Sequence, residues 1–465
     1  MRLTSLLIAP ALICGCTVGP NYQRPALAGE AHAFVEPSTP GPVDISWWRA
    51  FGDPVLTALV ERAIAANPDV REATARIAEA RANRDAARGG GEPQATAKGS
   101  ATENVLSKNG QLPIASIPGF KRSFPLYDLG FDASWELDLW GKNRREVEAA
   151  NARLEAAGYG RRDVMLSLIA EVARNYVDLR LAQADASALS ATAAADAELA
   201  RLSQLRYSAG EISKLEMDQA RATARTSAAA VPDASSRASA AAYRIAALVG
   251  SPPEDIAPAL LNPAPLPVSP DTILTGVRSE LLTRRPDIGG AERELAAATA
   301  EIGAAKADLF PRFSLLGSLG QQARKPGDLL STGSTRLQIG PSFSWPIFAT
   351  GTIRAQVRGA DAREEEAAAR YEKAVLGALA DSETAINRFL QARASLIDAE
   401  AALASQQSAL ALEARRVDIG EDDRLALERE RKNVLAAERR RNQAASDKSQ
   451  AAIALYKALG GGWRD

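Results

Sequence analysis

The sequence predicts a mainly α-helical protein with a transmembrane β-barrel portion, built from two internal repeats. Each repeat is expected to combine a β-hairpin with long antiparallel coiled-coil helices. Three observations lead to this fold class. Tryptophans and glycines recur 210 positions apart, long proline-free stretches rich in helix-forming residues recur at the same spacing, and segments of alternating apolar and polar residues precede them.

The composition excludes several classes of protein. The 465 residues include 56 basic and 57 acidic side chains, so the chain has no global field to hold a nucleic-acid backbone. His32 is the single histidine, which argues against a multi-histidine metal site and a histidine-based catalytic triad. No Walker-type or Cys-x-x-Cys motif occurs. We therefore expect no enzyme activity, no metal, no cofactor and no nucleic-acid partner.

The N-terminus indicates the compartment. Residues 1–15 have a basic start and a short apolar stretch, as in a cleaved signal peptide, and Cys16 follows small residues. The arrangement resembles a bacterial lipobox, in which Cys16 carries the covalent lipid and residues 16–45 form a lipidated, extended N-terminal segment. The alternative is an ordinary cleaved signal that leaves Cys16 as a thiol.

The internal repeat divides the rest of the chain. Trp135 pairs with Trp345, Gly210 with Gly420, and Gly250 with Gly460. We predict a first repeat over residues 46–250, a proline-rich connector over 251–275, and a second repeat over 276–465. Seven prolines between residues 251 and 270 predict that this connector is extended rather than helical.

Long helices are expected at about 142–249 and 351–460, each interrupted by a turn. Alanine, leucine, glutamate and arginine dominate both stretches, and Gly210 and Gly420 mark the turns. Pro232 predicts a break or bend in the returning helix. Leu168, Val172, Tyr176 and Leu179 are spaced as a coiled-coil seam.

Strands are expected at about 93–139 and 311–347. Between residues 127 and 139 every second side chain is apolar, and Asp128, Asp132, Glu136 and Asp138 lie on the opposite face. Four strands cannot close a membrane barrel, whereas three copies of the chain supply twelve and leave room for a lumen. The four acidic side chains would line that lumen. The alternative is a soluble sandwich packed by the apolar faces.

Six blocks carry a family resemblance over the whole chain. They are CTVGPNY at 16–22, WW and FGDP at 47–54, WELDLWGK at 135–142, RRPDI at 284–288, AKADLFP at 305–311 and LGGGW at 459–463. The chain resembles the NodT-type outer membrane factor lipoproteins, relatives of TolC and OprM. The resemblance implies a homotrimer with a twelve-stranded barrel in outer membrane lipid and an α-helical tunnel in the periplasm. It also implies a periplasmic adaptor and an inner-membrane pump, commonly of the resistance-nodulation-division type.

The expected function is a passive conduit that exports small molecules or drugs. Two alternatives remain, an exit duct for secreted polypeptides and a structural envelope lipoprotein. The far ends of the long helices are the candidate adaptor contacts, at Ser208, Ala209, Gly210, Ile419 and Gly420.

A cluster of charged residues at the second turn is the candidate periplasmic gate. Three-fold symmetry would bring its carboxylates toward one axis, where pairs with arginine would hold the mouth closed. The cluster consists of Arg415, Arg416, Asp418, Glu421, Asp422 and Asp423. The alternative is that the acids solvate the turn and that Asp422 or Asp423 caps the returning helix.

Overall fold

The computed structural model describes residues 17–25, 32–107 and 121–463. The predicted signal peptide and Cys16 lie outside the described residues. The chain divides into two compact units; one boundary follows Pro25, and the other four fall within four helices. We call them the sheet unit (17–25, 77–156 and 291–370) and the hairpin unit (32–76, 157–290 and 371–463).

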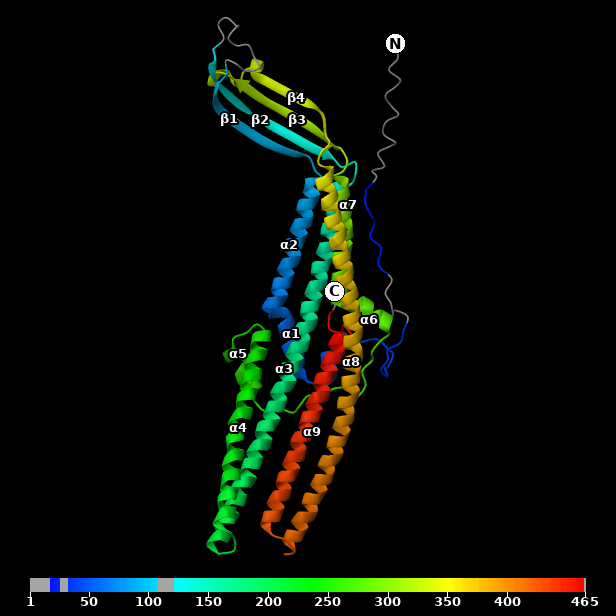
Figure 1. Ribbon diagram of the computed structural model, residues 1–465. Coiled ribbons are helices and arrows are strands. Elements are labelled where there is room, and N and C mark those ends of the chain that lie inside the picture. Colours follow the sequence, from blue (N-terminus) through cyan, green and yellow to red (C-terminus); the bar gives the residue numbers. More distant parts are fainter. Residues whose placement is uncertain (1–16, 26–31, 108–120, 464–465) are drawn as a thin grey trace. The chain divides into compact units, whose positions relative to one another are not determined.

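The sheet unit contains one antiparallel sheet with the strand order β1-β2-β3-β4 (Figure 1). Its strands are β1 (Gln94–Val105), β2 (Ser123–Leu137), β3 (Arg312–Ala323) and β4 (Thr335–Ser344). Two short 3-10 helices, Pro326–Asp328 and Thr332–Ser334, lie between β3 and β4. Each repeat therefore contributes one hairpin, and the hairpins join through β2 and β3. The mainly helical fold with two repeats and an antiparallel sheet is confirmed.

Four helices connect to the strands. α2 (Pro68–Gly90) leads into β1 and α7 (Pro286–Ala307) into β3, whereas α3 (Lys142–Ser208) follows β2 and α8 (Thr350–Asp418) follows β4. Within the sheet unit α3 and α7 pack through alanine. The buried cluster consists of Ala149, Ala152, Ala296, Ala297 and Ala300. Alanine has no long side chain, so the two helix backbones approach closely at this contact.

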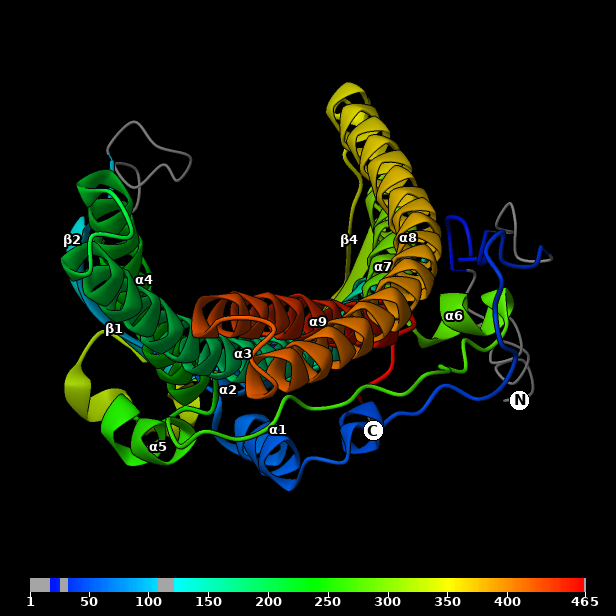
Figure 2. The ribbon, with the colours of Figure 1, turned by 90° about the horizontal axis from the view of Figure 1, so that it is seen from below.

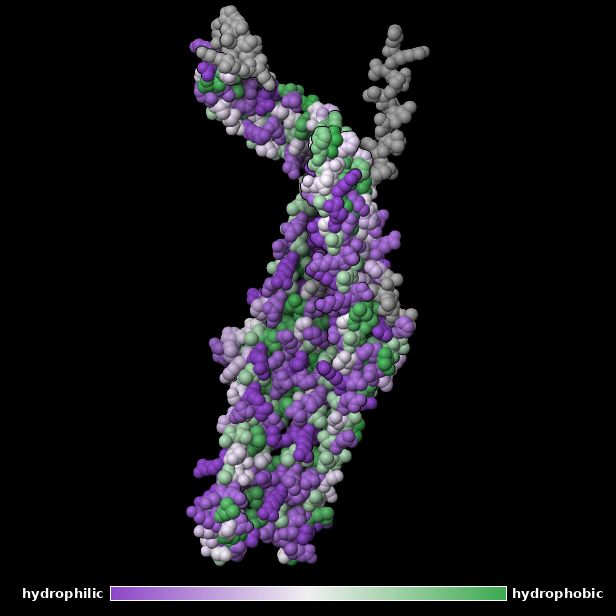
Figure 3. Space-filling view, in the orientation of Figure 1, coloured by the Kyte–Doolittle hydropathy of each residue, from purple (hydrophilic) through white to green (hydrophobic). Residues whose placement is uncertain are grey.

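The hairpin unit contains two helical hairpins. α3 pairs with α4 (Lys214–Leu248), and α8 pairs with α9 (Arg424–Ala458), as Figures 1 and 2 show. α4 is a single helix through Pro232, so the predicted break is not found. The predicted seam at Leu168, Val172, Tyr176 and Leu179 is buried. Hydrophilic residues cover most of the hairpin face seen in Figure 3.

The hairpin unit has a core of buried aromatic side chains. A 3-10 helix at Trp47–Phe51 places the fully buried Trp47 against Tyr456, with ring centroids 5.1 Å apart. The adjoining α1 (Pro54–Ala66) is capped by Asp53, whose carboxylate also accepts from the Tyr176 hydroxyl at 2.7 Å. Burial, followed by this hydrogen bond, raises the pKa of Tyr176 to about 12. The α1 cap and α3 are thereby tied together.

The proline-rich connector differs from the prediction, because it contains a helix, α5 (Pro253–Leu260). Proline is compatible with a first helical turn, since that N–H has no intrahelical partner. Glu254 and Asp255 favour the same turn through the helix dipole, and Ile256, Ala257 and Leu260 are buried. The extended assignment was wrong for these residues. A further short helix, α6 (Arg278–Arg284), precedes α7.

The repeat is visible in two equivalent hydrogen bonds from tryptophan side chains to the backbone. The Trp135 indole donates to the Gly91 carbonyl at 3.0 Å, and the Trp345 indole donates to the Leu309 carbonyl at 3.2 Å. Both acceptors lie just after the helix that precedes a hairpin. Among the described residues, no helix is long and apolar enough to cross a membrane.

Candidate functional site

The polar face of the sheet brings together three of the four predicted lumen residues. Asp128, Asp132 and Glu136 alternate along β2 on one face. Asp128 accepts from Arg336 Nη2 at 2.8 Å, from Arg336 Nε at 3.1 Å, and from Gln322 at 2.9 Å. Asp132 pairs with Lys98 at 2.8 Å. Ion pairs therefore link β2 to β1 through Asp132 and Lys98, and link β2 to β4, across β3, through Asp128 and Arg336.

Asp138 does not belong to that face. β2 ends at Leu137, and the Asp138 carboxylate accepts from the backbone N–H groups of Asn143 at 3.2 Å and Arg144 at 3.0 Å. It satisfies donors in the first turn of α3, which have no intrahelical acceptor. The structure thus makes Asp138 a helix-start residue rather than a strand residue.

The opposite face of the sheet carries large apolar side chains that are exposed in the single chain. Phe131 is 62% exposed, Ile339 is 72% exposed and Phe343 is 70% exposed. The register places the following residues on this face together with them: Leu129, Trp135, Leu315, Leu319 and Leu337. One face is therefore apolar and uncovered, and the other is charged and paired.

The two helical turns have the same backbone. Gly210 and Gly420 have φ of 78° and 77°, a conformation that glycine adopts without strain. The N–H of Glu211 donates to the Arg206 carbonyl, and the N–H of Glu421 donates to the Arg416 carbonyl, both at 2.9 Å. Ser208, Ala209 and Ile419 are exposed beside the glycines. The predicted tip residues therefore lie at the ends of the hairpins.

Charge gathers at the second turn. Arg416 contacts Asp422 at 3.0 Å, Glu413 at 3.4 Å and Glu421 at 3.9 Å. Asp423 is the N-cap of α9 and accepts from the Ala426 N–H at 2.9 Å, as the capping alternative predicts. Arg415 and Asp418 lie in the last turn of α8 and make no ion pair with the described residues.

Ion pairs between the two hairpins were not predicted. The carboxylate of Asp196 on α3, only 2% exposed, pairs with Lys432 on α9 at 2.5 Å and accepts from Ser227 on α4. Asp185 on α3 contacts Arg439 on α9 at 3.2 Å, and within its own hairpin it contacts Arg237 on α4 at 3.6 Å. Arg206 reaches Asp423 at 3.7 Å. Isolated aspartates in alanine-rich helices were the available signal, but their partners lie far away in the sequence.

The segment after Cys16 is held by a buried arginine, which sequence analysis also missed. Arg145 on α3, 3% exposed, donates to the Val18 carbonyl at 3.3 Å and to Asn21 Oδ1 at 2.7 Å. Its charge is balanced by Glu148 at 2.7 Å. A Cβ added at Gly303 would lie 2.8 Å from the Val18 carbonyl oxygen, so glycine permits the segment to lie against α7.

Comparisons with known proteins agree with this architecture. The family described as outer membrane efflux protein matches residues 59–251 and 277–461, one block in each repeat. The pyoverdine export outer membrane protein OpmQ of Pseudomonas aeruginosa is 30% identical over 471 residues, which cover 100% of this chain and 98% of OpmQ. Nodulation protein T of Rhizobium leguminosarum bv. trifolii is 30% identical over 81% of this chain and 79% of its own length.

Solved structures give the same result. The outer-membrane channel OprN is 35% identical and superposes with a TM-score of 0.85, covering 96% of this chain and 100% of OprN. The open-state MtrE channel of Neisseria gonorrhoeae is 27% identical with a TM-score of 0.81, covering 96% and 98%. The chain belongs to the outer membrane efflux protein family.

Proposed function

We propose that the protein is the outer membrane channel of a tripartite efflux system and that it acts as a passive conduit from the periplasm to the exterior. The observation that carries this function is the two-faced sheet. Its uncovered apolar face suits lipid, and its charged face suits an aqueous lumen. The protein resides in the outer membrane, and its helical hairpins form a tunnel in the periplasm.

Closure of the barrel requires further copies of the chain. Within one chain β1 and β4 are edge strands, and unpaired backbone groups in lipid cost several kcal/mol each. Three copies provide twelve strands, because each contributes four. The assembly is a homotrimer in which the β4 edge of one copy pairs with the β1 edge of the next.

The partners are a periplasmic adaptor and an inner-membrane pump, which supplies the energy. Cargo is of the small organic class, in keeping with the pyoverdine export that the name of OpmQ states. The charged face of the sheet, which lines the lumen in this proposal, suits the passage of polar or ionised molecules rather than a chemical reaction on them. The protein binds no cofactor and is not an enzyme.

Single-channel recording tests the conduit. The full-length trimer in planar bilayers should show discrete conductance. The variant Asp128→Asn should shift selectivity toward anions, because it leaves Arg336 unpaired in the lumen. Glu372→Gln on the exposed surface of α8 is the matched control and should leave selectivity unchanged. Absence of any conductance from correctly folded trimers of both the wild type and the gate variant Asp418→Ser, Arg416→Ser would refute the proposal.

Cys16 is the lipid attachment site in this proposal. The Arg145 contacts to residues 18 and 21 support it, because they fix the chain immediately after the cysteine. Cys16→Ser should abolish labelling with a fatty-acid analogue, while barrel insertion persists through the apolar sheet face. Labelling that survives the substitution would exclude Cys16.

The two turns form the adaptor-contact tip, and the charged cluster at the second turn is the periplasmic gate. Support comes from the open space around Gly210 and Gly420 and from the pairs that Arg416 makes. Gly210→Trp should reduce adaptor cross-linking without dissociating the trimer. Asp418→Ser combined with Arg416→Ser should enlarge the conductance, and wild-type conductance in this variant would leave only the capping role.

A further inference from the structure

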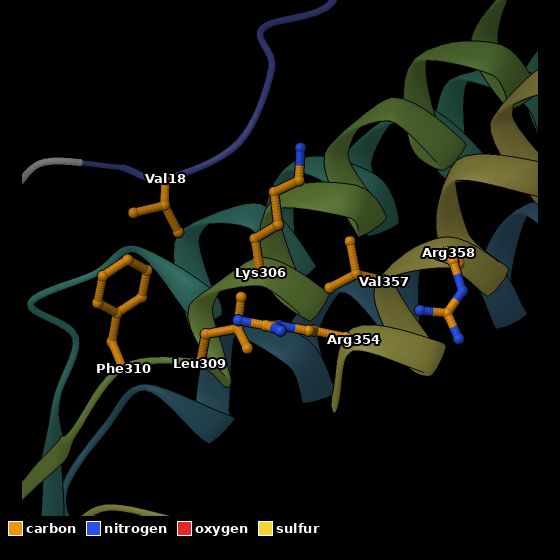
Figure 4. A pocket seen from close by; sticks show the side chains of 7 residues that line it. All are labelled: Val18, Lys306, Leu309, Phe310, Arg354, Val357 and Arg358. Atoms are coloured by element: carbon orange, nitrogen blue, oxygen red, sulfur yellow. The ribbon is translucent and has the colours of Figure 1, made fainter. Parts of the chain in front are cut away.

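A cavity of about 420 Å³ lies in the sheet unit, where α7 ends and α8 begins (Figure 4). Its apolar wall is formed by Val18, Leu309, Phe310 and Val357. The stems of Lys306, Arg354 and Arg358 complete the lining, and Figure 4 shows these three side chains extending from α7 and α8. Long basic side chains commonly cover apolar surface with their stems and leave the charge at the rim.

The three cations of this cavity are not neutralised by the part of the chain that the structure describes. Lys306, Arg354 and Arg358 make no ion pair or hydrogen bond with the described residues. Asp308, which is adjacent to Leu309 in sequence, already pairs with Lys142 at 2.8 Å and Arg312 at 2.6 Å. The rim therefore carries excess positive charge around an apolar interior.

The position of the cavity relates it to the membrane boundary. Phe310 is followed closely by β3, and Val18 lies two residues after the proposed lipid attachment at Cys16. Trp345 and Phe348, between β4 and α8, are 54% and 102% exposed. Exposed aromatic side chains at the end of membrane strands are typical of the headgroup level.

We propose that this cavity binds an anionic phospholipid of the periplasm-facing leaflet. One acyl chain lies on the apolar wall, and the phosphate meets Lys306, Arg354 and Arg358. The proposal rests on the outer membrane location given above. A net negative headgroup fits better than a zwitterionic one, because none of the three cations pairs with a carboxylate in the described part of the chain and basic pockets near a membrane surface attract anionic lipid.

Native mass spectrometry of the full-length trimer tests this site. The trimer is exchanged into vesicles of phosphatidylethanolamine alone or mixed with phosphatidylglycerol, and the lipid retained after extraction is measured. We expect retention of phosphatidylglycerol over phosphatidylethanolamine. The variant Lys306→Gln, Arg354→Gln, Arg358→Gln should lower that retention about tenfold or more. Arg370→Gln is the matched control, because Arg370 lies on the same helix and pairs with Glu366.

Three results would overturn the proposal. Equal retention in the wild-type and triple-variant trimers would exclude the cations as the lipid site. Phosphatidylglycerol binding that occurs only in Cys16→Ser would mean that the protein's own lipid fills the cavity. Loss of trimer in the triple variant without a change in lipid retention would assign the cations to a contact with a second copy.

A free anion is tested separately. Inorganic phosphate that binds in place of phosphatidylglycerol, and is lost in the triple variant, would also overturn the lipid assignment. Single-channel conductance of the same preparations separates this proposal from the channel function. Unchanged conductance with lost lipid retention supports the site, whereas absent conductance in every preparation would count against the channel itself.

Discussion

The two hairpin tips have one backbone and two charge patterns. Arg206 and Arg416 occupy equivalent positions, and each lies near a glutamate five residues later, at 3.1 and 3.9 Å. The first tip has Ser203, Ser208 and Ile212 where the second has Glu413, Asp418 and Asp422. The turn geometry was thus retained between the repeats while acidic side chains distinguish the second tip.

This difference in acidic side chains makes the second tip the more sensitive of the two to electrostatic interactions. In the first tip Arg206 has Glu211 and the more distant Asp423. In the second, Arg416 is shared by three carboxylates, and one oxygen of Glu413 is buried without a hydrogen-bond partner among the described residues. Excess negative charge therefore concentrates at the second tip, which is where the proposed gate lies.

The largest expected effect comes from breaking the buried link between the hairpins. Lys432→Met leaves the Asp196 carboxylate buried with only Ser227 beside it. Removing one partner of a buried pair costs about 3 kcal/mol or more. Hydrogen exchange of the α9 backbone amides measures the free energy of local opening, which should fall by this amount.

Arg237→Met is the control for this link, because Asp185 keeps Arg439 at 3.2 Å. Its effect should be clearly smaller. Unchanged exchange in Lys432→Met would show that the buried pair does not hold the hairpins together.

Substitution of the turn glycines should affect both tips equally. Gly210→Val and Gly420→Val each force a β-branched residue to positive φ, at a cost of about 1–2 kcal/mol in local opening free energy. Exchange rates of the Glu211 and Glu421 amides measure it. Gly359→Ala, inside α8 with open space around it, should instead be stabilising. Unequal losses at the two glycines would contradict the shared backbone.

The helix caps should show a smaller effect. Ser213 forms a capping box with Glu216, and Asp423 accepts from the Ala426 N–H. Ser213→Ala or Asp423→Ala should each cost about 1 kcal/mol in the stability of the first turn. Faster exchange of the Glu216 and Ala426 amides is the readout. If Asp423→Ala leaves the Ala426 amide protected, the carboxylate serves the charge cluster rather than the helix.

The smallest expected effect is a pH dependence confined to the second tip. Burial, followed by repulsion from Asp422, raises the pKa of Glu413 above its usual range. The folded tip then binds a proton more readily than the unfolded chain, so its stability rises as pH falls from neutral toward that raised pKa. Glu413→Gln should remove this dependence in exchange experiments. At the first tip Ser203 occupies the position of Glu413. A similar gain in stability there as pH falls would show that Glu413 is not the cause.

Much of the fold could be predicted from local patterns. Period-two alternation identified β2 and the shared face of Asp128, Asp132 and Glu136, and proline-free alanine-rich stretches identified the long helices. The same alternation extended β2 wrongly to Asp138, because a pattern of side chains does not show where backbone pairing stops. The number of prolines in the connector led to an extended assignment that missed α5, because proline is also favourable in the first turn of a helix.

The sequence by itself determined the repeats, the turns at Gly210 and Gly420, and the two-faced strands, because each depends on residues close together in the chain or on a fixed spacing. Only the tertiary structure revealed that Arg145 holds Val18, that Lys432 neutralises Asp196, and that Lys306, Arg354 and Arg358 surround one cavity. These side chains are far apart in the sequence. A local pattern of residues does not show which distant segments come into contact when the chain folds.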